Sequence, residues 1–267
     1  MTEKLNGEIL YEQLPLLSID AIPEGAGFLI RRDHPESRND RRKRTEFFTQ
    51  HFIEALQDPG WVLSKEYLNS VQTEQGETCY ETPLGRTVGQ SSIDQLSQIA
   101  QDEDIEARAN QFLRSFKGTG SEALDQALVM RTMELMATHS PEYNNLSFFR
   151  GGEFDSKDTF AGRDFATFDF ENALMKYSHH SMHSVHDKPR EKPVIITIPT
   201  LDIVDLFKKG QLNFLAPHNW YCEAIELKFN DRKAFLEKAT VLRAGLPEEK
   251  ERELIEQYRQ TKAIDLS

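Results

Sequence analysis

The chain has 267 residues, of which 38% are hydrophobic and 28% charged, a composition that predicts a soluble, globular protein and argues against a disordered chain. Its formal net charge of -12 argues against a general nucleic-acid binder, because such proteins need a basic face. No apolar run is long enough to span a membrane, and the first residues lack the basic and apolar segments of a secretory signal peptide.

Residues 1 to 90 form a mixed N-terminal region, which we interpret as a candidate target-binding region. Proline and glycine interrupt the first 30 residues, and residues 58 to 90 have the composition of loops with short elements. Between them a helix is expected, with an apolar side made of Phe47, Phe48, Phe52, Ile53 and Leu56. The basic residues 41 to 44 are interpreted as its solvated start, and a nuclear address or an anion patch are the alternatives.

Residues 91 to 138 carry apolar residues at spacings of three and four, which predicts consecutive helices. Gly118 and Gly120 are expected to end one helix, and Ser121 is placed to cap the start of the next. That helix is expected to stop near Pro141.

After residue 145 the pattern changes to that of strands. Strands are expected at 146–150, 164–168, 193–200, 223–229 and 239–244, with one helix at 171–177. Residues 246–267 are expected to end the chain as a charged amphipathic helix. A helical front half followed by a β-rich back half predicts a fold of the α+β class.

Arg150 lies at the end of the strand expected at 146–150, and Gly151 and Gly152 follow it. Arginine is costly to bury without an anionic partner, and glycine lets a backbone approach a ligand closely. We therefore interpret Arg150 and Gly151 as candidate binding residues for a negatively charged ligand such as a phosphate. A surface strand that ends in a turn is the alternative.

Glu223 is the candidate catalytic carboxylate. It opens the strand expected at 223–229, directly after a loop that carries Trp220 and Tyr221, two candidate substrate-binding residues. A carboxylate at the mouth of a strand beside aromatic side chains suits a ligand cleft. Glu226 is expected on the opposite face of the strand, because successive side chains alternate. An ordinary polar residue at a strand entrance is the alternative explanation for Glu223.

Thr167 lies in the strand expected at 164–168, among Phe165, Phe168 and Phe170. Its hydroxyl could orient a neighbouring carboxylate by a hydrogen bond. The aromatic rings could stack on a flat ligand ring, and core packing explains them equally well.

In their order along the chain, the strands that carry Arg150, Thr167 and Glu223 resemble the arginine–serine–glutamate group of the ADP-ribosyltransferase family, which includes bacterial toxins and effectors. An aromatic-Arg-Gly triplet ends the family's first core strand and matches residues 149–151. A Ser-Thr-Ser motif on the second strand aligns with residues 167–169, and the family's catalytic glutamate at the start of the fifth strand aligns with Glu223. The helices before the arginine strand are also similar, so that the resemblance covers residues 91 to 245.

The resemblance implies a mono-ADP-ribosyltransferase with a core of two packed sheets, NAD as a substrate and a protein as the acceptor. Arg150 would hold the NAD pyrophosphate or its ribose side, and Glu223 would stabilise the oxocarbenium-like state as nicotinamide leaves. The other residues expected to contact NAD or to position Glu223 are Gly151, Thr167, Phe168 and Phe170.

Two motifs depart from the family's pattern, at three positions. Thr167 keeps only the first hydroxyl of the Ser-Thr-Ser motif, because Phe168 and Asp169 follow it. Tyr221 stands two residues before Glu223, where the family has Glu in enzymes that modify arginine and Gln in those that modify asparagine. The acceptor side chain is therefore left open, and a catalytically inactive copy of the fold that binds a partner protein is the alternative.

A third hypothesis for the function of the chain is a metal hydrolase. Its basis is the histidine tract, which consists of His179, His180, His183 and His186 and is followed by Asp187. No HExxH pattern is present, and the tract falls between an expected helix and a strand bounded by prolines. We expect it to be a solvated loop, and we expect no metal in the reaction.

The C-terminal residues also bear on localisation. The stretch 247–257 is similar to the glutamate-rich blocks near the C-termini of bacterial type IV secretion effectors, which makes residues 246–267 a candidate secretion signal. The two cysteines, Cys79 and Cys222, give no disulfide framework and favour a reducing compartment. Together these features predict a secreted effector that acts on a protein in the cytoplasm of a host cell.

Overall fold

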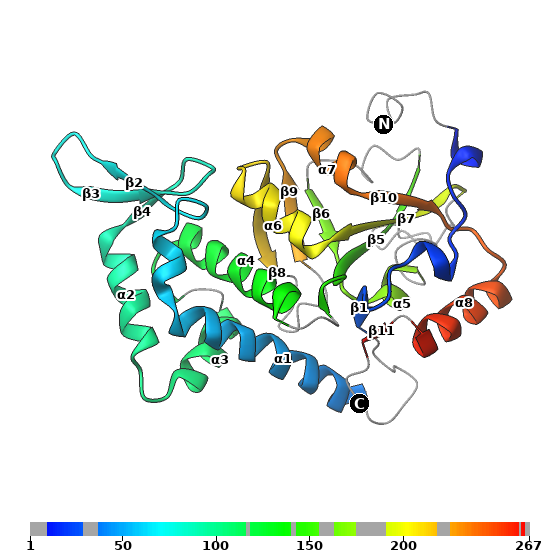
Figure 1. The fold of residues 1–267 in the computed structure, drawn as a ribbon, viewed down its shortest axis with the longest axis horizontal. Helices are drawn as coiled ribbons and strands as arrows, with labels where there is room; N and C mark the ends of the chain where they lie inside the picture. Colours follow the sequence, from blue (N-terminus) through cyan, green and yellow to red (C-terminus); the bar gives the residue numbers. More distant parts are fainter. Residues whose placement is uncertain are drawn as a thin grey trace, which may run out of the picture.

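The computed structural model describes residues 10–28, 37–115, 118–139, 143–154, 163–174, 191–217, 225–261 and 263–264. As predicted, the fold belongs to the α+β class, with most of the long helices and one small sheet in the first half of the chain and two antiparallel sheets in the second half (Figure 1). None of the described helices combines the length and the apolar character that crossing a membrane requires.

Four helices form the first half: α1 (Ser37–Gln57), α2 (Gln90–Ala100), α3 (Ile105–Ser115) and α4 (Glu122–Thr138). The predicted apolar side of α1 is confirmed for Phe48, Phe52 and Leu56, which are buried. The predicted cap of α4 is also confirmed, since the Ser121 hydroxyl oxygen accepts a hydrogen bond from the Leu124 N–H. Most of α4 is buried on all sides, because it lies between α1 and the β-rich half (Figure 1).

Residues 58 to 90 form more regular structure than their loop-like composition suggested. After a short helix, η4 (Pro59–Leu63), the strands β2 (Asn69–Gln72), β3 (Thr78–Glu81) and β4 (Thr87–Gly89) make an antiparallel sheet in that order. Gly76 and Gly85 close its two turns with φ angles of 80° and 70°, which favour glycine. The sheet lies beside α2, at the end of the molecule far from α8 (Figure 1).

Two three-stranded antiparallel sheets form the β-rich half. One has the order β10 (Thr240–Arg243), β7 (Pro193–Pro199), β5 (Ser147–Glu153), and the other has the order β6 (Arg163–Ala166), β9 (Ile225–Phe229), β8 (Leu212–Pro217). A single bridge between Phe149 and Thr167 connects them. The short helices of this half are α5 (Phe170–Asn172), α6 (Thr200–Lys208) and α7 (Arg232–Lys238). The sequence analysis did not predict α6, α7 or the strand β8.

The two ends of the chain pack together against this half. Two short helices, η2 (Tyr11–Gln13) and η3 (Ile19–Ala21), lead to β1 (Gly27–Phe28), which pairs in parallel with β11 (Ala263–Ile264). Helix α8 (Glu248–Thr261) buries Leu254, Ile255 and Tyr258. The predicted region 1–90 is therefore divided between the sheets and the helical half, and the predicted tail helix is an integral part of the fold.

The sheet β10-β7-β5 is buried on both faces by two separate apolar clusters. The main cluster includes Phe28, Phe148, Phe168, Ile196 and Leu227, and the second cluster includes Phe149, Phe170, Ile195, Leu242 and Tyr258. Burial on both faces explains the continuous run of apolar residues in β7.

Gly27 lies where β1 crosses the two clusters. A Cβ atom at this position would stand 2.5 Å from the Tyr258 hydroxyl, 2.7 Å from Cε2 of Phe149 and 2.7 Å from the carbonyl oxygen of Phe168. Only a residue without a side chain fits here, because a backbone atom cannot yield as the end of a flexible side chain can.

A polar network joins α4 to α6. Glu134 accepts hydrogen bonds from Lys208 at 2.6 Å, from Arg131 at 2.7 Å and from the Tyr67 hydroxyl at 2.8 Å. Burial alone would raise the pKa of Glu134, but these three donors outweigh it and hold that pKa below its ordinary value. The carboxylate is therefore a stabilising charge of the native state.

We predict that Gly27→Ala destabilises the protein by about 1–3 kcal/mol, the usual cost of overpacking a core. Chemical unfolding followed by circular dichroism measures the change. Gly89→Ala is the matched control, since the nearest atom to its Cβ would be the Ser91 hydroxyl at 3.6 Å. A similar effect of both substitutions would contradict the tight packing around β1.

We predict that the protein loses stability in acid as the Glu134 carboxylate becomes protonated. Its pKa lies below the ordinary value of 4.5, so its contribution is present above pH 4.5 and is lost as the pH falls through the lowered value. Glu134→Gln should cost about 2 kcal/mol at pH 7 and flatten the loss of stability below pH 4.5. The measurement is urea unfolding across this range, with Glu249→Gln at an exposed position as the control. An unchanged pH profile in Glu134→Gln would refute the assignment.

Candidate functional site around Arg150

Arg150 lies in the middle of β5 and not at its end. The strand continues to Glu153, and Gly151 and Gly152 pair with Ile195 and Val194 of β7. The expectation that the strand ends at residue 150 is therefore wrong, and so is the alternative of a turn at the two glycines. Ladder hydrogen bonds to β7 hold this backbone extended, and glycine tolerates that conformation although it favours it less than other residues do.

The side chain of Arg150 leaves β5 on the face of the main cluster. Side chains alternate along a strand, so Arg150 shares its face with Phe148. Ile196, its partner in β7, belongs to the same cluster. Arg150 is partly exposed, while Phe148 and Ile196 are buried. A cation at the edge of an apolar face is a suitable anchor for an anion, because the low local dielectric strengthens charge-assisted hydrogen bonds.

Thr167 lies beside Arg150 in space, but on the other face. Phe149 and Thr167 exchange both backbone hydrogen bonds, at 2.6 and 2.9 Å, so their side chains point to the same side. That side is the second cluster. The Thr167 hydroxyl is buried and accepts a hydrogen bond from the Asp169 N–H at 3.0 Å. Thr167 and Arg150 therefore face opposite sides of the sheet, and the position of Thr167 relative to Glu223 stays a prediction because Glu223 lies outside the described residues.

The phenylalanines near Thr167 belong to the core. Phe168 is fully buried, with its ring 3.9 Å from that of Phe148, and Phe170 is fully buried against Phe149 and Tyr258. Their packing contradicts the expectation that either ring stacks on nicotinamide in this conformation, because other side chains already cover both. Of the two explanations that the sequence left open, core packing is the one observed.

Asp169 has a structural role at the start of α5. Its carboxylate accepts hydrogen bonds from the Asn172 N–H at 3.1 Å and from Nδ2 of Asn172 at 2.6 Å. It also lies near Tyr258, where burial first and the Asp169 charge second raise the pKa of the hydroxyl. Among the described residues that hydroxyl has no hydrogen-bond partner. Asp169 is thus the N-terminal cap residue of α5.

The predicted catalytic and substrate-binding residues of the later loop lie outside the described residues. These are Trp220, Tyr221 and Glu223, and the histidine tract also lies outside them. The structure does describe β9, which starts two residues after Glu223. Ile225 pairs there with Ala166 of β6, and Glu226 pairs with Phe165. The start of β9 therefore lies at the end of β6 that adjoins Thr167 and β5.

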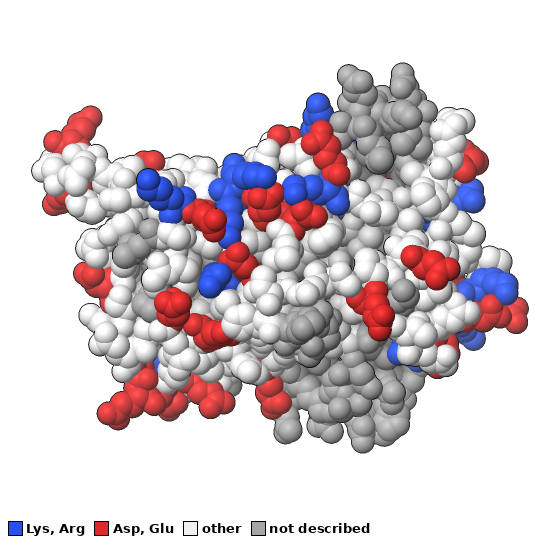
Figure 2. All heavy atoms as spheres, viewed as in Figure 1, with Lys and Arg blue, Asp and Glu red and all other residues white. Residues whose placement is uncertain are grey.

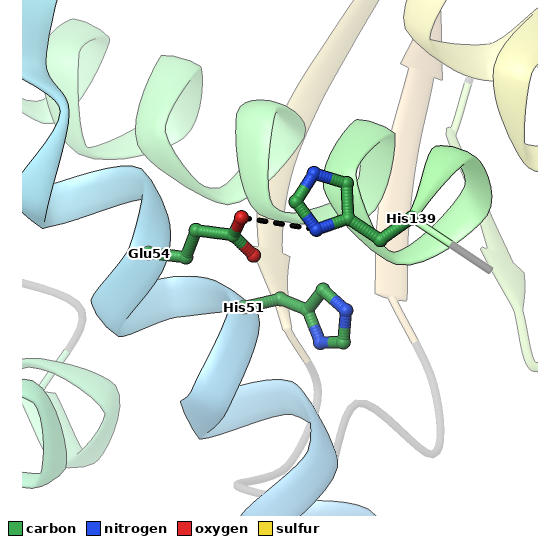
Figure 3. Close-up of side chains that lie close together, drawn as sticks. All are labelled: His51, Glu54 and His139. Carbon is green, nitrogen blue, oxygen red and sulfur yellow. Dashed lines mark ion pairs between the residues drawn. The ribbon is translucent and has the colours of Figure 1, made fainter.

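A group of potential metal ligands was not predicted from the sequence. One ligand atom from each of His51, Glu54 and His139 lies within 4.8 Å of the others, at the junction of α1 and α4 (Figure 3). Sequence spacing could indicate only the pair on α1, because residue 139 joins it through tertiary packing.

Comparisons of the chain with models of protein families, with curated proteins and with solved structures found no match.

Proposed function

We propose that the protein is a mono-ADP-ribosyltransferase that moves ADP-ribose from NAD to a side chain of a target protein. The observation that carries the proposal is the row of strands β5, β6 and β9. The Phe149–Thr167 bridge sets β6 beside β5, and the Ala166–Ile225 pair sets the start of β9 beside β6. Neighbouring strands are about 4.8 Å apart, so the backbone that leads to Glu223 starts roughly 10 Å from that of Arg150.

That separation suits a dinucleotide whose pyrophosphate is bound by Arg150 and whose nicotinamide ribose lies at Glu223. In the proposed reaction, Arg150 holds the pyrophosphate through charge-assisted hydrogen bonds. The bond between the ribose C1′ and the nicotinamide nitrogen breaks, and its electron pair leaves with nicotinamide. Glu223 stabilises the positive charge that develops on the ribose. A nucleophilic atom of the target forms the new bond to C1′ and loses a proton to solvent or to a carboxylate.

The remaining parts of the proposal follow from their positions. Thr167 supports the β5–β6 junction and is not part of the reacting group. Trp220 and Tyr221, just before Glu223, contact the target protein or the nicotinamide. The chain acts as a secreted bacterial effector in the host cytoplasm, with residues 246–267, which include α8, as the candidate secretion signal.

A second candidate function is supported by Asp169. A family member that has lost two hydroxyls and uses the third position of the motif to cap a helix could keep the fold and bind a partner without catalysis. Incubation with labelled NAD and a cell lysate separates the two functions. Label on discrete protein bands supports the transferase, and an absence of label together with measurable NAD binding supports the inactive form.

We predict that Glu223→Gln lowers NAD turnover roughly 100- to 1000-fold, the usual effect of removing a preorganised group that stabilises developing charge. Glu226→Gln is the matched control, since Glu226 pairs with Phe165 on β6 and stands one alternation past Ile225. Nicotinamide release measures both variants. A larger loss in Glu226→Gln would show that the register proposed for the catalytic residue is wrong.

We predict that Arg150→Lys weakens NAD binding although the charge is kept, because lysine lacks the planar fork that holds phosphate oxygens in pairs. Isothermal titration calorimetry with NAD measures the affinity of both proteins, and thermal unfolding checks that the variant keeps the native fold. Equal affinities in two folded proteins would exclude Arg150 from the dinucleotide site.

A further inference from the structure

Three metal-ligand side chains meet where α1 packs against the end of α4. His51 and Glu54 are one turn apart on α1, and His139 is the C-terminal cap residue of α4. Figure 3 shows the His51 ring beside the Glu54 carboxylate and the His139 ring. One ligand atom from each residue lies within 4.8 Å of the other two. Two imidazoles and one carboxylate are a common ligand set for divalent transition metals.

His51 is held in the orientation that a metal ligand needs. Its ring is buried and lies 4.6 Å from the ring of Phe47. Its Nδ1 is 2.9 Å from the carbonyl oxygen of Phe47, an acceptor, so Nδ1 carries the proton. The other nitrogen, Nε2, then has a lone pair and no hydrogen-bond partner among the described residues. A hydrogen bond from one ring nitrogen to a carbonyl is the usual support for a metal-binding histidine.

Glu54 and His139 can rearrange around an ion. His139 Nδ1 and Glu54 Oε1 are 2.9 Å apart, and both side chains are 41% exposed. An exposed pair of this kind contributes little to stability, so exchanging it for metal bonds costs little. Ligand atoms of a tetrahedral zinc site are about 3.4 Å apart, given zinc–nitrogen distances of about 2.1 Å. The ligand atoms of the three residues lie within 4.8 Å of one another, so small movements of the Glu54 and His139 side chains would bring them to this spacing.

A cavity beside the cluster supplies solvent and negative charge. Its volume is about 780 Å³, and Glu54 and His139 form part of its wall. Glu46 and Glu106 also line it, so carboxylates surround the site on two helices. In Figure 2 the part of the visible face over α2, α3 and the adjoining end of α1 carries mainly acidic side chains. Such a field attracts cations, and the open side leaves a coordination position to water.

We propose that His51 Nε2, a carboxylate oxygen of Glu54 and His139 Nδ1 bind a divalent transition-metal ion, with zinc as the best fit and water as the fourth ligand. In the metal-bound form the neutral His139 ring carries its one proton on Nε2, because Nδ1 must offer its lone pair to the ion. The ion joins α1 to the end of α4 and stabilises the helical half. The site does not depend on the proposed transferase function.

The experiment measures zinc binding to the full chain from which the competing histidine tract has been removed. The background protein carries His179→Ala, His180→Ala, His183→Ala and His186→Ala. On it, Glu54→Gln and His139→Ala remove exposed ligands, and Gln50→Ala is the matched control in the wall of the same cavity. Calorimetry with zinc chloride gives affinity and stoichiometry. Thermal unfolding with and without zinc shows whether the ion stabilises the fold.

The proposal predicts one zinc ion per chain, a rise in melting temperature with zinc, and no effect of Gln50→Ala. Glu54→Gln and His139→Ala should each weaken binding by more than the roughly 10- to 100-fold that loss of an outer hydrogen-bond partner costs. Cobalt(II) in place of zinc should give the absorption bands of a tetrahedral site in the background protein only. The proposal would be overturned if the background protein, which lacks the histidine tract, bound no zinc. It would also be overturned if His139→Ala left the zinc affinity unchanged. NAD turnover is measured in parallel, and its presence or absence does not affect this result.

Discussion

The burial of β5 on both faces is the constraint on which the β-rich half depends. Phe148 packs against Phe168 on one face, and Phe149 packs against Phe170 and Tyr258 on the other. A slip of one residue against β7 would exchange the two faces and place Arg150 among fully buried side chains. Because a buried guanidinium without its proper partner is costly, this register is strongly specified. The same register sets Phe149 opposite Thr167, and so determines where β6 and then β9 lie.

This constraint excludes one of the two explanations that the sequence offered for the glycines after Arg150. They lie inside the ladder with β7, so they do not form a turn at the end of the strand. Gly152 is two residues after Arg150 and therefore shares its face, where it presents no side chain next to the arginine. Gly152 is itself buried, so a side chain at this position would add volume to the packed face beside Arg150.

Sequence patterns were informative where structure is local and uninformative where it depends on tertiary pairing. The helical spacing of Phe48 and Phe52 and the cap at Ser121 involve neighbours along the chain, and both were predicted correctly. The length of β5 was not, since pairing with β7 overrides the weak strand preference of glycine. The face of Thr167 depends on its partner across the bridge, which spacing cannot reveal. His51 and His139 are 88 positions apart and meet only because α1 packs on α4.

The two proposed sites are connected by contacts between aromatic rings, which raises the question of whether one regulates the other. His51 packs on Phe47, Phe47 packs on Phe28, and Phe28 packs on Phe168 next to β5. A continuous path of contacts does not by itself transmit a signal, because coupling requires an element with two arrangements whose balance both sites alter. Phe28 and Phe168 are fully buried and closely packed, which favours one arrangement. We therefore infer that a metal ion at His51 would stabilise the helical half and leave the proposed transferase reaction at Arg150 unchanged.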